Sequence, residues 1–283
     1  MTLHDALSEA RARLTRAGIR ADEAAIDVDV YARTILGWDR ARLIADLREP
    51  MPAALEPTFS AWVARREQRE PTAYITGTRE FWGLDLTVSS AVLIPRPESE
   101  LIVEAALRLV PTDRPARLAD VGTGSGCLAL AIAHERPLVT VTATDISAEA
   151  LAVASGNATR LGMSQRVHCV CTSFLDGVDG PFDLIVANPP YVKDGDLPAL
   201  SRQVAGYEPH VALFGGSDGL RAVAQVLDGA ATRLVPGGWL VMEFGLGQDE
   251  GVSALITAHP AFRLDHILHD LQGIPRTAVA QLA

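Results

Sequence analysis

The chain has 283 residues, 48% of them hydrophobic, and a formal net charge of -10. Its length predicts a main domain with a smaller companion. The acidic balance disfavours a protein that spreads over a nucleic-acid backbone, because such proteins cluster Lys and Arg. With no basic, apolar leader and no apolar run near the roughly 18 residues of a membrane span, we expect a cytoplasmic protein without stable nucleic-acid or membrane contacts.

Residues 1–70 show apolar side chains at helical spacing, and we expect Ile26 and Phe59 to face a core among them. Thr2 is a suitable cap for the first helix, because its hydroxyl can accept from a free amide and Asp5 follows in the first turn. The mixed charges of Arg65–Glu70 predict a solvated helix face. This region is predicted to form a small helical bundle.

Residues 71–97 change to alternating apolar and polar positions, which predicts a β-hairpin linker. From residue 98 to 283, short apolar strands alternate with helices, an order that indicates an α/β domain with a parallel sheet. The tail offers two further strands. The predicted strands begin near Leu118, Val139, Val167, Phe182, Trp239, Phe262 and Thr277.

The first of these strands runs into a glycine-rich turn, Gly122-Thr123-Gly124-Ser125-Gly126, and then into a helix. Glycines permit a tight turn and the close approach of a ligand to the backbone. The second strand ends at Asp145, whose carboxylate can accept both hydroxyls of a ribose. These features alone fit either a dinucleotide or S-adenosylmethionine.

The strand beginning at Phe182 delivers Asn188-Pro189-Pro190-Tyr191 at its carboxyl end, the edge at which open α/β sheets bind ligands. The Asn188 side-chain oxygen and the Pro189 main-chain oxygen can accept the two N–H groups of a planar nitrogen. Proline stiffens the turn, and the Tyr191 ring can stabilise positive charge that develops during methyl transfer. We find no nucleophilic triad and no metal-spaced cluster, so no metal is expected; His266 and His269 are expected to be structural.

Several motifs together resemble the PrmC (HemK) family, which methylates the glutamine nitrogen in the Gly-Gly-Gln motif of class I peptide chain release factors. The resemblance runs from the helical N-terminal region to the end of the catalytic domain. The motifs are Gly77-Thr78-Arg79-Glu80-Phe81, Ile94-Pro95-Arg96-Pro97-Glu98-Ser99-Glu100, Asp120-Val121 with the glycine turn, Asn188-Pro189-Pro190-Tyr191-Val192 and Glu208-Pro209-His210-Val211-Ala212-Leu213-Phe214-Gly215-Gly216.

The resemblance implies a seven-stranded, Rossmann-like, S-adenosylmethionine-dependent methyltransferase domain with an antiparallel last strand, joined by the hairpin to the N-terminal bundle. It implies that residues 122–126 line the methionine part of the cofactor, Asp145 its ribose and Phe174 its adenine, with Asn188 also among the cofactor-binding residues. The product would be S-adenosylhomocysteine. Some family members carry Trp at the position of Phe174, and this substitution keeps stacking but loses an indole hydrogen bond. Asn188 and Tyr191 would contact the glutamine amide.

Three alternatives stay open. A sister enzyme could methylate a ribosomal-protein glutamine, and an adenine-N6 or guanine-N2 nucleic-acid methyltransferase could use the same tetrapeptide on an exocyclic amino group. A non-catalytic protein could keep the fold. The motif around Arg96 and the acidic charge favour the release factor, and we expect residues 1–70 to dock this protein substrate, because one glutamine offers little surface for specificity.

Overall fold

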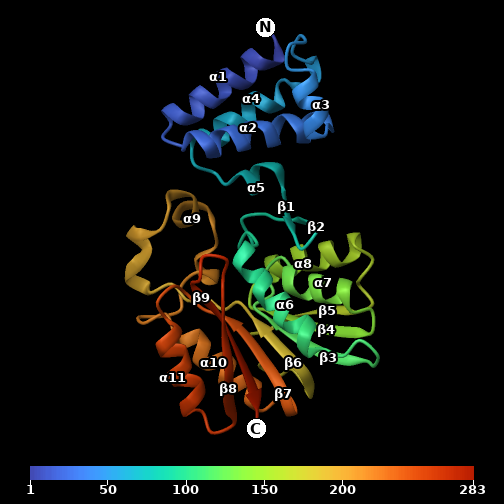
Figure 1. Cartoon of the computed structure of the whole chain (residues 1–283), viewed down its shortest axis with the longest axis vertical. Helices are drawn as coiled ribbons and strands as arrows, with labels where there is room; N and C mark the ends of the chain where they lie inside the picture. The colour runs from blue at the N-terminus through green and yellow to red at the C-terminus, as the bar shows by residue number, and fades with distance from the viewer. The chain divides into compact units, whose positions relative to one another are not determined.

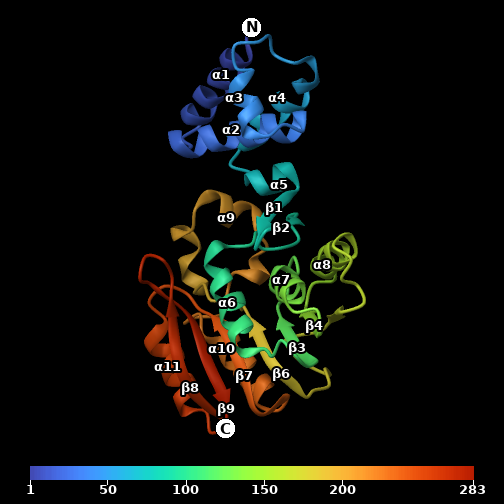
Figure 2. The ribbon, with the colours of Figure 1, turned by 45° about the vertical axis from the view of Figure 1, so that its right-hand side comes forward.

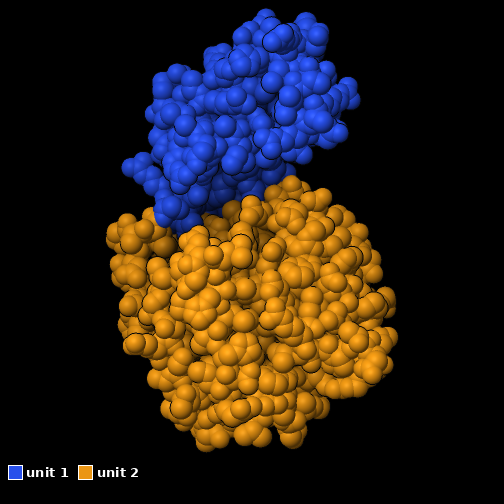
Figure 3. Space-filling model, in the orientation of Figure 1, with its two compact units in different colours: residues 1–77, 201–207 blue, residues 78–200, 208–283 orange.

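The structure, a computed structural model, describes residues 1–283 and divides into two compact units. Unit 1 comprises residues 1–77 and 201–207, and unit 2 comprises residues 78–200 and 208–283, drawn in different colours in Figure 3. No helix is both long enough and apolar enough to cross a membrane.

Unit 1 is helical throughout. Its elements are α1 (Leu3–Arg16), α2 (Ala21–Leu36), α3 (Arg40–Ala45), the 3-10 turn η1 (Ala53–Leu55), α4 (Thr58–Glu67), α5 (Thr72–Thr76) and α9 (Arg202–Tyr207). The Thr2 hydroxyl accepts from the Asp5 amide and the Asp5 carboxylate accepts from the Thr2 amide, which confirms the predicted cap. Leu7, Val28 and Phe59 pack into one apolar core.

Two expectations for unit 1 are wrong. Ile26 is 64% exposed, because the buried face of α2 runs through Ala24, Asp27 and Val28. Arg66 is only 2% exposed rather than solvated, since its Nε donates to the Asp27 carboxylate at 2.7 Å. Asp27 and Arg66 are charged. A prediction that places only apolar residues on the buried face of a helix therefore assigns both of them to the solvent-exposed face.

The boundaries of unit 1 differ from residues 1–70. Ile75 of α5 belongs to its apolar core, so the chain leaves this unit only after residue 77. The segment 201–207 joins it through two hydrogen bonds, Arg66 Nη1 to the Gln203 side-chain oxygen at 3.0 Å and the Tyr207 hydroxyl to the Gln68 main-chain oxygen at 2.8 Å.

Unit 2 begins with the expected hairpin, formed by the antiparallel strands β1 (Thr78–Phe81) and β2 (Leu84–Thr87). Within residues 71–97 the hairpin therefore occupies only residues 78–87. Phe81 and Leu86 are buried in the same core as the main sheet, so the hairpin packs on unit 2. A 3-10 turn, η2 (Pro97–Ser99), then leads into α6 (Glu100–Leu109).

The main sheet has seven strands in the order β5-β4-β3-β6-β7-β9-β8. The first five in this order are parallel, and β9 runs antiparallel to both of its neighbours. These features confirm the expected fold (Figures 1 and 2). The strands are β3 (Ala116–Val121), β4 (Val139–Asp145), β5 (Val167–Cys171), β6 (Phe182–Ala187), β7 (Leu234–Glu243), β8 (Phe262–His269) and β9 (Pro275–Leu282).

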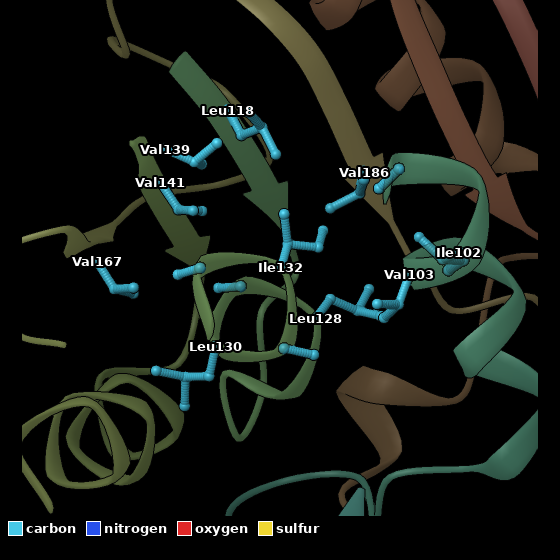
Figure 4. Packing of buried hydrophobic residues seen from close by; sticks show 14 of the residues in the cluster. Ile102, Val103, Leu118, Leu128, Leu130, Ile132, Val139, Val141, Val167 and Val186 are labelled. Carbon is cyan, nitrogen blue, oxygen red and sulfur yellow. The ribbon is translucent and has the colours of Figure 1, made fainter. Parts of the chain in front are cut away.

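Helices cover both faces of the sheet. Alternation along β6 explains this, since Leu184 and Val186 enter one core and Ile185 and Ala187 enter the other. Figure 4 shows the first core, where Val103 of α6 and Leu128 of α7 pack together. The helices are α6, α7 (Cys127–Glu135) and α8 (Ala148–Arg160) over the first core, and α10 (Arg221–Ala231) and α11 (Asp249–Ala258) over the second; η3 (Asp194–Ala199) and η4 (His210–Ala212) lie in the connection after β6.

Candidate active site

The glycine turn connects β3 to α7 as predicted. Gly122, Gly124 and Gly126 have φ values of 72°, 54° and 83°, in the left-handed region that side chains disfavour. A β-carbon on Gly122 or Gly124 would meet no atom within 4 Å, so this side of the turn is open. One on Gly126 would lie 3.3 Å from the Ala154 side chain, so Gly126 permits α7 to pack closely on α8.

The side chain of Asp120, in β3, holds the glycine turn through hydrogen bonds. It is fully buried, and its Oδ2 accepts from the Thr123 hydroxyl at 2.6 Å and from the Ala129 amide at 3.1 Å. Burial raises the pKa of Asp120 to about 6, because the charged carboxylate is desolvated. The side chain thus ties the turn to the first residues of α7.

Asp145 ends β4 beside the same turn. Its Oδ2 accepts from the Gly124 amide and its Oδ1 from the Ser147 amide, both at 2.9 Å. The Ser147 hydroxyl accepts from the Ala150 amide at 3.1 Å, so Ser147 caps α8. Each carboxylate oxygen keeps acceptor capacity for a ligand, since a carboxylate offers about four lone-pair sites.

Asn188-Pro189-Pro190-Tyr191 follows β6, which pairs directly with β3. The strand order places β3 and β6 at the point where the sheet topology reverses, so the tetrapeptide and the glycine turn share one edge, as predicted. The Asn188 Nδ2 donates to the Ser99 hydroxyl at 3.0 Å. The Tyr191 hydroxyl donates to the Glu243 carboxylate at 3.2 Å.

One cavity of about 690 Å³ opens at this edge. Its walls include almost all of the predicted site: Gly122, Thr123, Gly124, Ser125, Asp145, Phe174, Asn188, Pro189 and Pro190. Gly126 and Tyr191 do not line it. Gly126 serves helix packing, and Tyr191 lies behind Asn188 in contact with Glu243.

Phe174 lies in the loop after β5 and lines this cavity. Its φ of 50° is rare for a residue with a bulky side chain. Strained backbone of this kind persists where the surroundings hold it, and the ring packs partly against the second core. An aromatic face is thereby presented to the cavity.

The segment 213–219 holds the tetrapeptide from the other side. The Val192 amide donates to the Leu213 oxygen at 2.8 Å, and the Gly215 amide donates to the Val192 oxygen at 2.9 Å. The Gln248 Nε2 donates to the Tyr191 main-chain oxygen at 3.0 Å. The backbone after Asn188 is therefore fixed by hydrogen bonds on both sides.

The rim of the cavity carries charged and apolar groups. One nitrogen of Arg96 donates to both oxygens of Glu208, at 2.6 and 2.8 Å, and the Glu208 side chain is only 1% exposed. Val211, on the same rim, is 57% exposed. Arg221 and Gln225 add one face of α10. The lining of the cavity thus mixes charged and apolar side chains.

Burial also raises the pKa of two side chains here, Tyr191 of the tetrapeptide and its partner Glu243. Desolvation raises the pKa of Glu243, although hydrogen bonds from Ser99 and Tyr191 oppose the shift. Desolvation, the negative charge of Glu243 and the hydrogen bond to it raise the pKa of the Tyr191 hydroxyl. Tyr191 is accordingly neutral at physiological pH.

Sequence reasoning assigned no role to Ser99, Glu243 or Gln248. Ser99 was named only within the motif Ile94-Pro95-Arg96-Pro97-Glu98-Ser99-Glu100, and Glu243 was not named at all. The available signal was position, because an acidic residue that closes an apolar strand lies at the ligand-binding edge of a parallel sheet.

Comparisons with known proteins place the chain among methyltransferases. The sequence profile of the PrmC N-terminal domain matches residues 5–77, and that of the methyltransferase small domain matches residues 99–204. A release factor glutamine methyltransferase of Bradyrhizobium diazoefficiens is 42% identical over 264 residues, covering 92% of this chain and 89% of that protein.

Other relatives agree. A release factor glutamine methyltransferase of Moorella thermoacetica is 41% identical over 285 residues, covering 99% of this chain and 98% of that protein. The crystal structure of a methyltransferase from Pyrococcus furiosus aligns with a TM-score of 0.54 at 20% identity, covering 70% of this chain and 89% of that chain. The structural likeness shows a shared fold.

Proposed function

The chain belongs to the release factor glutamine methyltransferase family, and on that premise we propose that it transfers a methyl group from S-adenosylmethionine to the side-chain nitrogen N5 of the glutamine in the Gly-Gly-Gln motif of class I release factors. One observation carries the proposal. The open glycine turn, Asp145 and Asn188-Pro189-Pro190 line a single cavity at the carboxyl edge of the sheet. The residues that would bind the cofactor and those that would hold the planar acceptor nitrogen therefore line the same cavity.

The residues present fit S-adenosylmethionine. The turn is open at Gly122 and Gly124, where a side chain would project into free space. Asp145 has acceptor capacity for ribose hydroxyls, and Phe174 offers an aromatic face for adenine. When bound, the cofactor supplies a methyl group on a positively charged sulfur and leaves as S-adenosylhomocysteine.

The tetrapeptide would hold the acceptor nitrogen. An amide nitrogen is a weak nucleophile because its lone pair is delocalised, so orientation and charge stabilisation must lower the barrier. Asn188 Oδ1 would accept one substrate N–H and the Pro189 main-chain oxygen the other. Two acceptors favour the positive charge that develops on nitrogen.

Two alternatives share this chemistry. A nucleobase amino group presents the same geometry, but the net charge of -10 opposes nucleic-acid binding. A ribosomal-protein glutamine would be held in the same way. The family to which the chain belongs favours the release factor.

We further propose that unit 1 docks the release factor. Its two ion pairs at Arg66 and its own apolar core make it a separate folded body rather than an extension of the sheet domain. A glutamine side chain alone buries far less than the roughly 800 Å² per partner of a specific protein interface. A second contact surface is therefore required.

A methyl-transfer assay tests the proposal. The protein would be incubated with labelled S-adenosylmethionine and, separately, with release factor, ribosomal proteins, DNA and RNA. We expect label on the release-factor glutamine, located by mass spectrometry, and none on a release factor with that glutamine replaced by alanine. Label on nucleic acid alone would overturn the proposal.

A further inference from the structure

Behind the tetrapeptide lies a buried chain of hydrogen bonds that joins three separate elements. Asn188 Nδ2 donates to Ser99 Oγ at 3.0 Å, and Ser99 Oγ donates to Glu243 Oε2 at 2.6 Å. Ser99 comes from η2, Asn188 follows β6 and Glu243 ends β7. Ser99 and Glu243 are each only 2% exposed.

We propose, on the basis of the proposed function, that Ser99 and Glu243 are positioning residues that orient the Asn188 amide so that its oxygen faces the acceptor nitrogen. Asn188 is the group that touches substrate, and the other two act only through it. The side-chain oxygen and nitrogen of an asparagine have nearly the same shape, so only the hydrogen-bond network decides which of them faces the cavity.

Counting hydrogens sets the direction of this network. An ionised carboxylate only accepts, and a serine hydroxyl has one hydrogen to donate. The Ser99–Glu243 distance of 2.6 Å is typical of a short hydrogen bond from a hydroxyl to a carboxylate, which commits that hydrogen to Glu243. Ser99 can then only accept from Asn188. While Glu243 is ionised, the amide nitrogen must therefore face Ser99, and Oδ1 is left for the cavity that Asn188 lines.

The opposite orientation would abolish the proposed chemistry. With its nitrogen towards the cavity, Asn188 would place its own N–H groups against the N–H groups of the substrate amide. No hydrogen bond could form between two sets of donors. Glu243 also holds the Tyr191 hydroxyl through Oε1 at 3.2 Å, so the same carboxylate secures both ends of the tetrapeptide. Its two oxygens serve one function each.

The charge state of Glu243 is set by its surroundings. It faces Ser99 and Glu98 from η2 and Tyr191 from the tetrapeptide, with Arg276 on β9 and Cys127 at the start of α7 also within electrostatic reach. Protonated Glu243 could donate to Ser99, which would free the Ser99 hydrogen to donate to Asn188 Oδ1 and reverse the amide. The inference therefore requires ionised Glu243 for turnover.

Ser99→Ala is the primary test, measured with a Gly-Gly-Gln acceptor and with cofactor binding by calorimetry. We expect kcat to fall about 10- to 100-fold, as for a misoriented reacting group, with cofactor affinity unchanged and with Ser99→Thr, which restores the hydroxyl, close to wild type. Thr277→Val is the matched control. Thr277 is a fully buried hydroxyl residue that pairs with Glu243 across β7 and β9, and its Oγ1 has no partner.

A double-mutant cycle with Asn188→Ala separates positioning from general support of the fold. If Ser99 acts through Asn188, adding Ser99→Ala to Asn188→Ala should change kcat by less than about 2-fold, because the amide to be oriented is gone. Full additivity of the two losses would overturn the inference, as would wild-type kcat in Ser99→Ala. A wild-type enzyme that methylates no glutamine would instead overturn the proposed function.

A pH profile supplies the second readout. Because the pKa of Glu243 is raised, wild-type kcat should fall on the acidic side as Glu243 gains a proton. Glu243→Gln should start lower, because a carboxamide can accept from Ser99 or donate to it, and should lose that acidic limb. An acidic limb that persists unchanged in Glu243→Gln would contradict the role of Glu243.

Discussion

Gly219 lies against the main-chain oxygen of Tyr191, with φ at 77°, so closely that a β-carbon on Gly219 would collide with that oxygen. The same β-carbon would lie 2.5 Å from the Gln248 Nε2 that donates to the Tyr191 oxygen. The conformation of the tetrapeptide thus depends on a residue that does not line the cavity.

Gly219→Ala should accordingly displace the tetrapeptide while leaving the glycine turn intact. We expect kcat to fall about 100-fold, as for a shift of about 1 Å at a reacting centre, with cofactor affinity within about 3-fold of wild type. Steady-state kinetics would measure kcat, and calorimetry would measure cofactor affinity. Gly195→Ala is the control, because Gly195 has no atom within 4 Å of an added β-carbon and no positive φ. Equal activity of both variants would show that the contact is unimportant.

Asn188→Ala should bind cofactor normally and lose most of its turnover. The variant removes an acceptor that is used as charge develops on nitrogen, and loss of one such group costs about 10²- to 10³-fold in kcat. Single-turnover methyl transfer and calorimetry would check the two halves of this expectation. Turnover within 2-fold of wild type would refute the role of Asn188.

Phe174→Ala should weaken cofactor binding without slowing transfer at saturation. Stacking of an aromatic ring contributes about 0.5 to 1.5 kcal/mol beyond buried area, so KM for S-adenosylmethionine should rise about 10-fold. Phe174→Trp keeps the face and should remain near wild type. A thermal melt of each variant would show whether the strained loop, with φ at 50°, still folds. If kcat fell with KM unchanged, Phe174 would not be a binding residue.

Asp27→Ala should unfold unit 1 selectively. It leaves the buried Arg66 with Glu23 as its remaining acidic partner and removes the acceptor of the Thr72 hydroxyl. Breaking a buried pair costs about 3 to 5 kcal/mol. Asp29→Ala breaks a more exposed pair with Arg11, and should cost under about 1 kcal/mol.

The same variant tests docking by unit 1. We expect Asp27→Ala to lower kcat/KM on intact release factor and to spare cofactor binding and methylation of a short Gly-Gly-Gln peptide. Denaturant unfolding would establish the state of unit 1. Undiminished kcat/KM on intact release factor, with unit 1 unfolded, would remove the docking role.

Asp120→Asn should change how stability depends on pH. The folded-state pKa of Asp120, about 6, lies above its ordinary value of 3.8, so the folded chain holds this proton more tightly than the unfolded chain. Ionisation of Asp120 therefore lowers the free energy of unfolding. This loss of stability is absent below about pH 4 and complete above about pH 6. Roughly two pKa units correspond to at most about 3 kcal/mol.

Asn keeps an acceptor for Thr123 and Ala129 and never ionises. The free energy of unfolding of Asp120→Asn minus that of wild type should consequently rise between pH 4 and pH 7, as measured in denaturant at each pH. A difference that is the same at both ends would mean that folding does not raise the pKa of Asp120.

The local sequence was sufficient to predict the strands. Alternating or continuous apolar residues indicate directly which side chains are buried on the faces of a sheet. The adjacency of the glycine turn and the tetrapeptide also followed, since parallel strands end at one edge. Ile26 and Arg66 were misjudged for one reason. Asp27 and Arg66 lie 39 residues apart, and helix periodicity cannot show that two charges will neutralise each other in a core.

The sequence by itself determined the α/β class, the glycine turn after β3, the position of Asp145 at the end of β4 and the Asn188-Pro189-Pro190-Tyr191 motif, because each is a contiguous pattern whose geometry follows from backbone chemistry. Only the tertiary structure decided what surrounds that motif. Ser99 and Glu243 lie 144 residues apart and meet at 2.6 Å, and such a meeting depends on strand order and helix packing. Hydrogen-bond direction, and with it the orientation of Asn188, exists only once those elements are assembled.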